Sequence, residues 1–135
     1  FIVDNLDYLA RAGQVSDRIA RITKTLSLRP TLVMKKGKMT LGRVFFGSRH
    51  RAWRKYIKST LSVMSHIDTH MLFITYTSMK RSDLEWIKEQ VEKIIHFENI
   101  YFQKAAPSVS VNSGPGTFGL LFREKKLDQF SESSS

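Results

Sequence analysis

The chain has 135 residues, no cysteine, and 22 basic against 12 acidic side chains, a net charge of +10. The missing cysteine excludes disulfides, zinc–thiolate centres and thiol catalysis, and it suits a cytoplasmic protein. A hydrophobic content of 41% is that of one globular domain. No apolar run approaches the ~20 residues of a membrane span, and the positive field favours acidic partners.

Two short helices are expected first. Asp4 or Asn5 can cap a helix that ends at Gly13, where glycine tolerates left-handed geometry. Ser16 can cap a second helix that runs to Leu26. Because the chain begins at Phe1 without an initiator methionine, we expect it to be part of a longer protein.

A β-hairpin over residues 30–46 follows. Pro30 can open its first strand, since a missing N–H matters least at a strand's first residue. Lys36-Gly37 suits the turn, because glycine allows the positive φ that a tight hairpin needs. The return strand, residues 39–46, carries apolar residues on both faces, so we expect both faces to be at least partly covered.

The second half of the chain alternates between helical and strand patterns. Residues 49–64 form a basic amphipathic helix, and a helix that starts at a Ser82/Glu85 capping box reaches Ile95. Strands are expected at residues 71–77, 99–105, 108–112 and 117–123, with a tight loop at 113–116.

These elements indicate the fold class. A strand, a crossover helix and a second strand imply some parallel pairing, joined right-handedly. Most of the helices cannot bury their apolar stripes without the sheet. We therefore predict an α/β fold: a layered domain over residues 1–126 whose mixed sheet combines a hairpin with strand–helix–strand units and is packed by helices. Residues 127–135 are rich in serine and acidic residues and are expected to form a frayed tail.

The basic helix is the most pronounced surface feature. Its cations, among them Arg49, Arg51, Arg54 and Lys55, can form a docking surface for an acidic protein partner, or simply a solvated face. The alternative function is a nucleic-acid-binding or regulatory domain that acts through residues 49–64. Trp53 and Tyr56 fall on the apolar stripe and are badly placed to stack on bases, so nucleic acid is disfavoured as a partner.

Residue patterns give little support for catalysis or metal binding. His66, Asp68 and His70 alternate and would share one side of an extended chain, but no fourth ligand is near in sequence. The run from Gly114 to Thr117 makes a poor phosphate loop, since proline donates no hydrogen bond and a strand follows. We expect no catalytic residue, no metal and no cofactor. A hydrolase whose residues escape recognition is the third hypothesis.

Three segments together resemble the DegV family of bacterial fatty-acid-binding proteins. FIVDNLDYLARAGQVS at residues 1–16 is similar to the family's leucine-rich helix and its Gly-Gly-Arg-Ile-Ser turn. LSLRPTLVMKKGKM at 26–39 is similar to its Leu-x-Ile-Lys-Pro-Ile-Leu strand and Asp-Gly-Lys hairpin. SVNSGPGTFGLLF at 110–122 is similar to its His-x-Gly-Pro-Gly-x-x-Gly segment.

The resemblance covers only the second of the family's two domains. It implies a non-enzymatic carrier that holds a long-chain fatty acid between the domains and, in some members, presents it to a fatty acid kinase. Asn112 stands where many members have a histidine near the carboxylate, and Ala12 and Gln14 replace the Gly and Arg of the turn. Phe46 or Gly47 stands where an arginine is common, which puts kinase pairing in doubt. The implied lipid-binding residues are Asn112, Ser113, Gly114, Leu28 and Pro30.

The free energy of burying an acyl chain predicts how this chain binds fatty acid alone. Burying about 14 methylenes is worth on the order of 11 kcal/mol, at ~0.8 kcal/mol each, and half a tunnel supplies about half of that. One asparagine hydrogen bond adds about 1 kcal/mol. We therefore expect the isolated chain to bind fatty acid weakly or not at all, and to self-associate through its exposed apolar surface.

Overall fold

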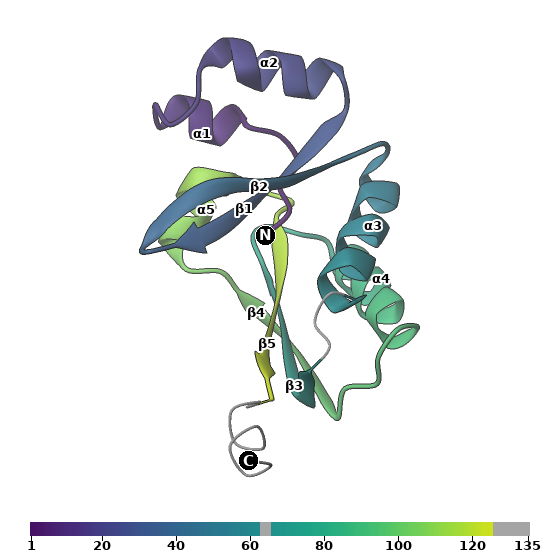
Figure 1. The fold of residues 1–135 in the computed structure, drawn as a ribbon. Helices are drawn as coiled ribbons and strands as arrows, with labels where there is room; N and C mark the ends of the chain where they lie inside the picture. The colour runs from purple at the N-terminus through teal and green to yellow at the C-terminus, as the bar shows by residue number, and fades with distance from the viewer. Residues whose placement is uncertain (63–65, 126–135) are drawn as a thin grey trace, which may run out of the picture.

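The computed structural model describes residues 1–62 and 66–125, and the elements below are those of this part of the chain. There are five helices and five strands: two helices and a hairpin come first, and helices and strands alternate from α3 onward (Figure 1). Their bounds are α1 Asp7–Arg11, α2 Asp17–Thr25, β1 Leu28–Lys35, β2 Lys38–Phe46, α3 Arg49–Ser62, β3 Ile67–Tyr76, α4 Arg81–Glu92, β4 Asn99–Lys104, α5 Pro107–Ser113 and β5 Phe118–Glu124.

The strands confirm the predicted mixed α/β class. β1 and β2 form an antiparallel hairpin, and a second sheet has the order β4-β3-β5, with β3 parallel to β4 and antiparallel to β5. Ile2 makes an isolated bridge to Thr31 on one side and to Phe118 on the other. The first residues of the chain therefore join the hairpin to β5, a connection that the sequence did not predict.

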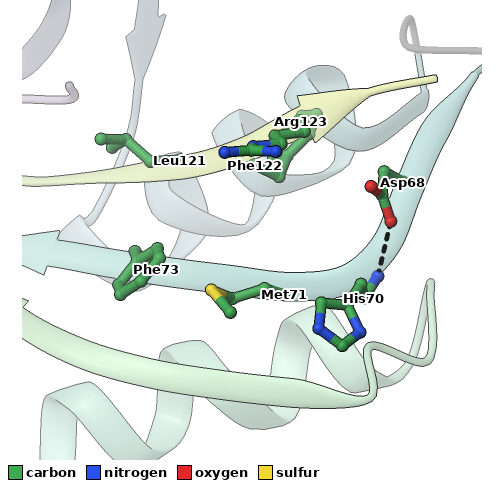
Figure 2. Close-up of a pocket in the computed structure, with 7 residues that line it drawn as sticks. All are labelled: Asp68, His70, Met71, Phe73, Leu121, Phe122 and Arg123. Atoms are coloured by element: carbon green, nitrogen blue, oxygen red, sulfur yellow. Dashed lines mark hydrogen bonds between the residues drawn. The ribbon is translucent and has the colours of Figure 1, made fainter. Parts of the chain in front are cut away.

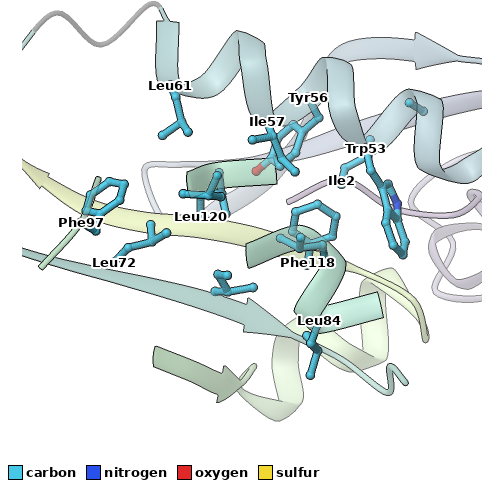
Figure 3. Close-up of a cluster of buried hydrophobic side chains, with 14 of the residues drawn as sticks. Ile2, Trp53, Tyr56, Ile57, Leu61, Leu72, Leu84, Phe97, Phe118 and Leu120 are labelled. Atoms are coloured by element: carbon cyan, nitrogen blue, oxygen red, sulfur yellow. The ribbon is translucent and has the colours of Figure 1, made fainter. Parts of the chain in front are cut away.

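The helices α3 and α4 cover one face of the three-stranded sheet. α3 and α4 pack on one face, where the alternate β3 residues Leu72 and Ile74 are fully buried in the main core (Figure 3). Trp53 and Phe118 meet edge to face in the same core, with ring centroids 5.2 Å apart. A smaller cluster on α1, α2 and the hairpin contains Val3, Leu6, Leu9, Ala20 and Leu32.

The hairpin turn forms as predicted. Lys36 and Gly37 have φ values of 50° and 79°, as a tight two-residue turn requires. The predicted coverage of both faces of the return strand is wrong. Phe45 is buried on one face, but Val44 and Phe46 on the other face are 52% and 62% exposed.

Two predictions in the second half are also wrong. α4 starts at Arg81 with Lys80 as N-cap, so Ser82 lies inside the first turn and makes no cap, and the helix ends at Glu92. The segment predicted as strand 108–112 is helix α5, because Pro107 occupies its first turn, where a fixed φ and a missing N–H cost nothing. The alternating Ser-Val-Ser-Val pattern gave the false strand signal.

Three further predictions concern the ends of elements. Ser16 caps α2 as expected, accepting a hydrogen bond from the Ile19 amide at 3.2 Å. Residues 63–64 of the predicted basic helix and the predicted tail at 127–135 lie outside the described residues.

Within the part of the chain that the structure describes, no helix is long and apolar enough to cross a membrane.

Candidate functional site

The residues expected to contact lipid fall into two places. Asn112 and Ser113 form the last turn of α5, and Gly114 follows as its C-cap. Leu28 and Pro30 lie on β1, where the buried Pro30 accepts a hydrogen bond from the Val3 amide at 3.0 Å through its carbonyl. The structure thus keeps the first three together and places the other two on the hairpin.

Asn112 is held by a second amide side chain. Its Oδ1 accepts a hydrogen bond from Gln14 Nε2 at 2.9 Å, and its Nδ2 donates to the Ser108 carbonyl at 2.8 Å. Gln14 lies in the turn between α1 and α2, 98 residues away in sequence. We call Gln14 and Asn112 the amide pair. Sequence reasoning noted each residue singly and gave no signal that they touch.

The turn after Asn112 is closed by buried polar contacts. Thr77 Oγ1 donates to the Gly114 carbonyl at 2.7 Å and accepts from the Thr117 amide at 3.0 Å. The Gly114 amide donates to Ser110 and the Gly116 amide to Ser78, both through carbonyls. Because these amides are all engaged and Pro115 has none, the turn offers no backbone donor to an anion, as the sequence predicted.

Gly114 also allows α5 to approach α1 closely. Its φ is 78° with ψ at −179°, a conformation that is essentially restricted to glycine. A Cβ at this position would lie 2.4 Å from Cδ1 of Tyr8 on α1. Glycine is therefore required here both by the backbone and by the Tyr8 ring.

A hollow of about 400 Å³ opens on the sheet itself (Figure 2). Its apolar walls come from β3 and β5 and include Met71, Phe73 and Leu121, while Asp68, His70 and Arg123 contribute polar groups. Phe73 stacks on Tyr101 of β4 at 5.5 Å, and Leu121 and Tyr101 are 41% and 46% exposed. Its volume falls within the roughly 300–1,000 Å³ of small-molecule sites.

One row of β3 runs from this hollow toward the turn beside Asn112, but Thr75 and Thr77 in that row are buried, at 4% and 5% exposed. Side chains alternate along a strand, so Phe73 and Thr75 lie on the face opposite Leu72 and Ile74, which pack against α3 and α4. The same alternation, continued past the strand end, leads to Thr77, which bonds to Gly114. At ~3.3 Å per residue, about 13 Å separate Phe73 from Thr77.

The predicted docking cations are exposed but mostly engaged within the chain. Arg49 pairs with Asp4 at 3.3 Å, and Asp4 also binds Arg29 at 2.6 Å. The Arg54 guanidinium lies 5.6 Å from the Trp86 ring, and Lys55 Nζ lies 4.7 Å from the Phe46 ring. Arg51 is exposed on the same helix.

The same helix directs its aromatic residues inward. Trp53 is 1% and Tyr56 9% exposed, so neither can stack on a base. This agrees with the predicted apolar stripe.

The polar residues 66–70 do not converge. The Asp68 carboxylate accepts a hydrogen bond from the His70 amide at 2.9 Å, while His70 Nδ1 lies 3.6 Å from Glu98. Within residues 1–62 and 66–125, no three His, Asp or Glu side chains are close enough to hold a metal ion.

The chain was compared with known protein families, curated proteins and solved structures. A family model described as an uncharacterised protein of the DegV family matches residues 1–125. No curated protein matches the chain.

Three solved structures illustrate the likeness in fold. A DegV family protein from Eubacterium eligens loaded with heptadecanoic acid is 16% identical, with a TM-score of 0.70 over 92% of this chain and 44% of its own. The fatty acid kinase (Fak) B3 protein of Streptococcus pneumoniae, loaded with linoleic acid, is 11% identical with a TM-score of 0.70 over 92% and 43%. A Thermus thermophilus DegV family protein, described by its fatty acid binding, gives 20% identity and 0.65 over 89% and 44%. The chain thus spans less than half the length of each.

Proposed function

The chain belongs to the DegV family, and on that premise we propose that it forms one wall of a long-chain fatty-acid carrier and catalyses no reaction. The observation that supports this best is the apolar hollow on the sheet face that α3 and α4 leave uncovered. The acyl chain lies along β3 and β5, over Phe73 and Leu121. Its head group lies toward Asn112, Ser113 and Gly114, at the other end of the same face.

The dimensions limit this placement. An extended chain of 16 carbons is about 19 Å long, given C–C bonds near 1.5 Å. Phe73 and Thr77 are about 13 Å apart along β3, but Thr75 and Thr77 are only 4% and 5% exposed, so the acyl chain contacts the hollow around Met71, Phe73 and Leu121 and leaves the sheet before Thr75. Each methylene removed from water contributes about 0.8 kcal/mol, so the acyl chain supplies most of the affinity and the head-group contacts supply orientation.

The hairpin residues take a secondary part in this proposal. Leu28 is partly exposed on β1 whereas Pro30 is buried there, so a lipid can reach Leu28 more readily than Pro30.

The basic helix α3 is the proposed docking surface for an acidic partner. Its exposed cations, Arg51 and Lys55 among them, project away from the core that Trp53 and Tyr56 enter. A kinase subunit that phosphorylates the bound fatty acid fits this chemistry. Arg51→Glu is expected to weaken such a complex at low salt while fatty acid binding stays unchanged.

A matched pair of variants tests the lipid site. Leu121→Lys places a charge in the hollow at a side chain that is already 41% exposed, so the fold should tolerate it. Leu26→Lys makes the same change at the C-cap of α2, where the leucine is 60% exposed and outside the hollow. Titration of the delipidated full-length gene product with hexadecanoic acid should show at least a tenfold loss for the first variant only, since a buried lysine is costly. Equal affinities of the two variants contradict the proposed site.

A further inference from the structure

β4 is an edge strand that lacks the usual protection against pairing with another chain. Among the described residues it pairs only with β3, so one side of its backbone has no neighbouring strand. Edge strands of soluble proteins are commonly protected by charged side chains, proline or a β-bulge. Between Asn99 and Gln103, β4 has no charge and no proline, and its register with β3 is unbroken. By contrast β2, the edge strand of the hairpin, carries Arg43 and a register irregularity against β1.

The free side of β4 presents the backbone groups of alternate residues. The amide of Ala105, the first residue after the strand, donates to the Tyr76 carbonyl of β3 at 2.8 Å. Because the amides and carbonyls of a strand point alternately to its two sides, those of Tyr101 share the direction of Ala105, toward β3. Ile100 and Phe102 therefore direct their amides and carbonyls to the free side, where another strand can bind them.

The sequence of β4 and its flanks is complementary to itself in the antiparallel direction. Residues 98–104 are ENIYFQK, with Tyr101 at the centre. When two copies pair antiparallel about Tyr101, Glu98 of each copy lies opposite Lys104 of the other, and opposite charges across a strand pair attract. The remaining positions match amide with amide and apolar with apolar side chains, namely Asn99 with Gln103 and Ile100 with Phe102. This register thus gives every residue of the segment a compatible partner.

The side chains of β4 suit this pairing on both faces of the sheet. Ile100 and Phe102 are partly buried against the main core on the face that α3 and α4 cover, so the pairing extends an existing apolar layer. Tyr101 lies on the opposite face, 46% exposed, and its ring stacks on Phe73 with centroids 5.5 Å apart. Its backbone points toward β3, so two Tyr101 residues face each other as a non-hydrogen-bonded pair, with Cα atoms about 4.5 Å apart and side chains in contact.

We propose that β4 pairs with β4 of a second copy of this chain, antiparallel and centred on Tyr101, so that the two β4-β3-β5 sheets become one. The net charge of +10 opposes contact between copies at most surfaces, whereas this edge places an acid and a base where they match. A parallel arrangement in register sets Glu98 beside Glu98 and Lys104 beside Lys104, and it does not close about a twofold axis. The face that carries the hollow then continues from one copy into the other. The proposal does not depend on the carrier function.

Charge reversal tests the pairing and its register. The full-length gene product should be a dimer at about 100 µM in analytical ultracentrifugation at low salt, where exposed charges are least screened. Glu98→Lys and Lys104→Glu, both at exposed positions, each set like charges opposite each other at both ends of the pair. Each variant alone should therefore dimerise at least about tenfold more weakly than the native protein. An equimolar mixture of the two variants restores opposite charges at both ends and should form a heterodimer of native affinity.

Glu92→Lys is the matched control for the charge variants. Glu92 is exposed on α4, and the substitution changes the net charge as much as Glu98→Lys does. Because it lies outside the paired segment, it should leave the dimer affinity within about twofold of the native value.

A second pair of variants tests the backbone hydrogen bonds. Ile100→Pro and Ile100→Ala both remove the isoleucine side chain, but only proline removes the amide that points to the free side of β4. Proline is tolerated in an edge strand at such a position, so the β3–β4 ladder should persist, as circular dichroism checks. Ile100→Pro should abolish the dimer, whereas Ile100→Ala should only weaken it.

The outcomes that overturn the proposal are distinct. A native protein that stays monomeric at about 100 µM shows that β4 does not bind a second copy, whether another part of the protein or an extended segment of a different protein covers it. A native dimer that both charge variants leave unchanged uses another surface. Charge variants that weaken the dimer but do not recover when mixed contradict the antiparallel register.

Discussion

Replacing Gly114 with alanine should disrupt the contact between α5 and α1 that holds the proposed head-group residues in place. The backbone there has φ 78° and ψ −179°, and a non-glycine residue held in this region costs about 1–3 kcal/mol. The new Cβ would also lie 2.4 Å from Cδ1 and 2.7 Å from Cε1 of Tyr8, an overlap that the ring must move to relieve. Overpacking of this kind costs about 1–3 kcal/mol, so we expect a total loss of about 4 kcal/mol.

Gly116→Ala is the matched control for this experiment. Gly116 also has a positive φ, of 76°, but a Cβ there would lie 3.9 Å from the nearest heavy atom, in Asp4. Only the backbone cost of about 1–2 kcal/mol then applies. Urea unfolding of both variants, followed by circular dichroism, measures the difference, which should be about 2–3 kcal/mol.

A double variant separates the two causes. In a Tyr8→Ala background the ring is absent, so Gly114→Ala should cost only what its backbone conformation demands. The reasoning fails if Gly114→Ala and Gly116→Ala destabilise equally, or if removal of the Tyr8 ring leaves the cost of Gly114→Ala unchanged.

Two further predictions concern charge and pH. Asp4→Asn should lower the free energy of unfolding by about 1–3 kcal/mol, because Asp4 binds two arginines in a partly buried site, whereas Asp7→Asn, which loses one exposed lysine partner, should cost less than about 0.5; urea unfolding at two salt concentrations checks both. Burial raises the pKa of Tyr56 from 10.0 to about 12, so its contribution is complete below pH 10 and is lost as pH rises through 12; Tyr56→Phe should remove that alkaline loss, monitored by tyrosinate absorbance.

Sequence patterns correctly predicted the features that depend only on neighbouring residues, namely a turn, a helix cap and a helical apolar stripe. The positive φ that Gly37 permits and the cap that Ser16 supplies depend on a few neighbouring residues, so both appear where the sequence places them. The stripe that buries Trp53 and Tyr56 follows from helical periodicity in the same way. Helix α5 was missed because alternating serine and valine favour a strand, while the contacts of Val109 and Ser113 that stabilise the helix are tertiary.

The site itself was less accessible to sequence reasoning. The amide pair joins residues 98 positions apart, and no periodicity or spacing indicates that they touch. The bridging role of Ile2 depends on two strands that lie far apart in sequence from it. The hollow lies where none of the described helices covers β3 and β5 around Phe73 and Leu121, which is a property of the assembled layers rather than of any segment.

The placement of Asn112 as a head-group contact stays a prediction. Asn112 does not line the hollow of Figure 2. It lies two residues before Gly114, which accepts a hydrogen bond from Thr77, just past the end of β3. The structure adds a hydrogen-bond partner, Gln14, for this residue.

Photo-crosslinking tests the proposed path of the acyl chain most directly. A fatty acid with a diazirine near its methyl end is bound to the full-length gene product, irradiated, and the modified peptides are identified by mass spectrometry. We predict labelling of β3 and β5 around Phe73 and Leu121. Labelling confined to α2, or none above the level seen with excess unlabelled fatty acid, contradicts the claim that this sheet face forms a wall of the lipid site.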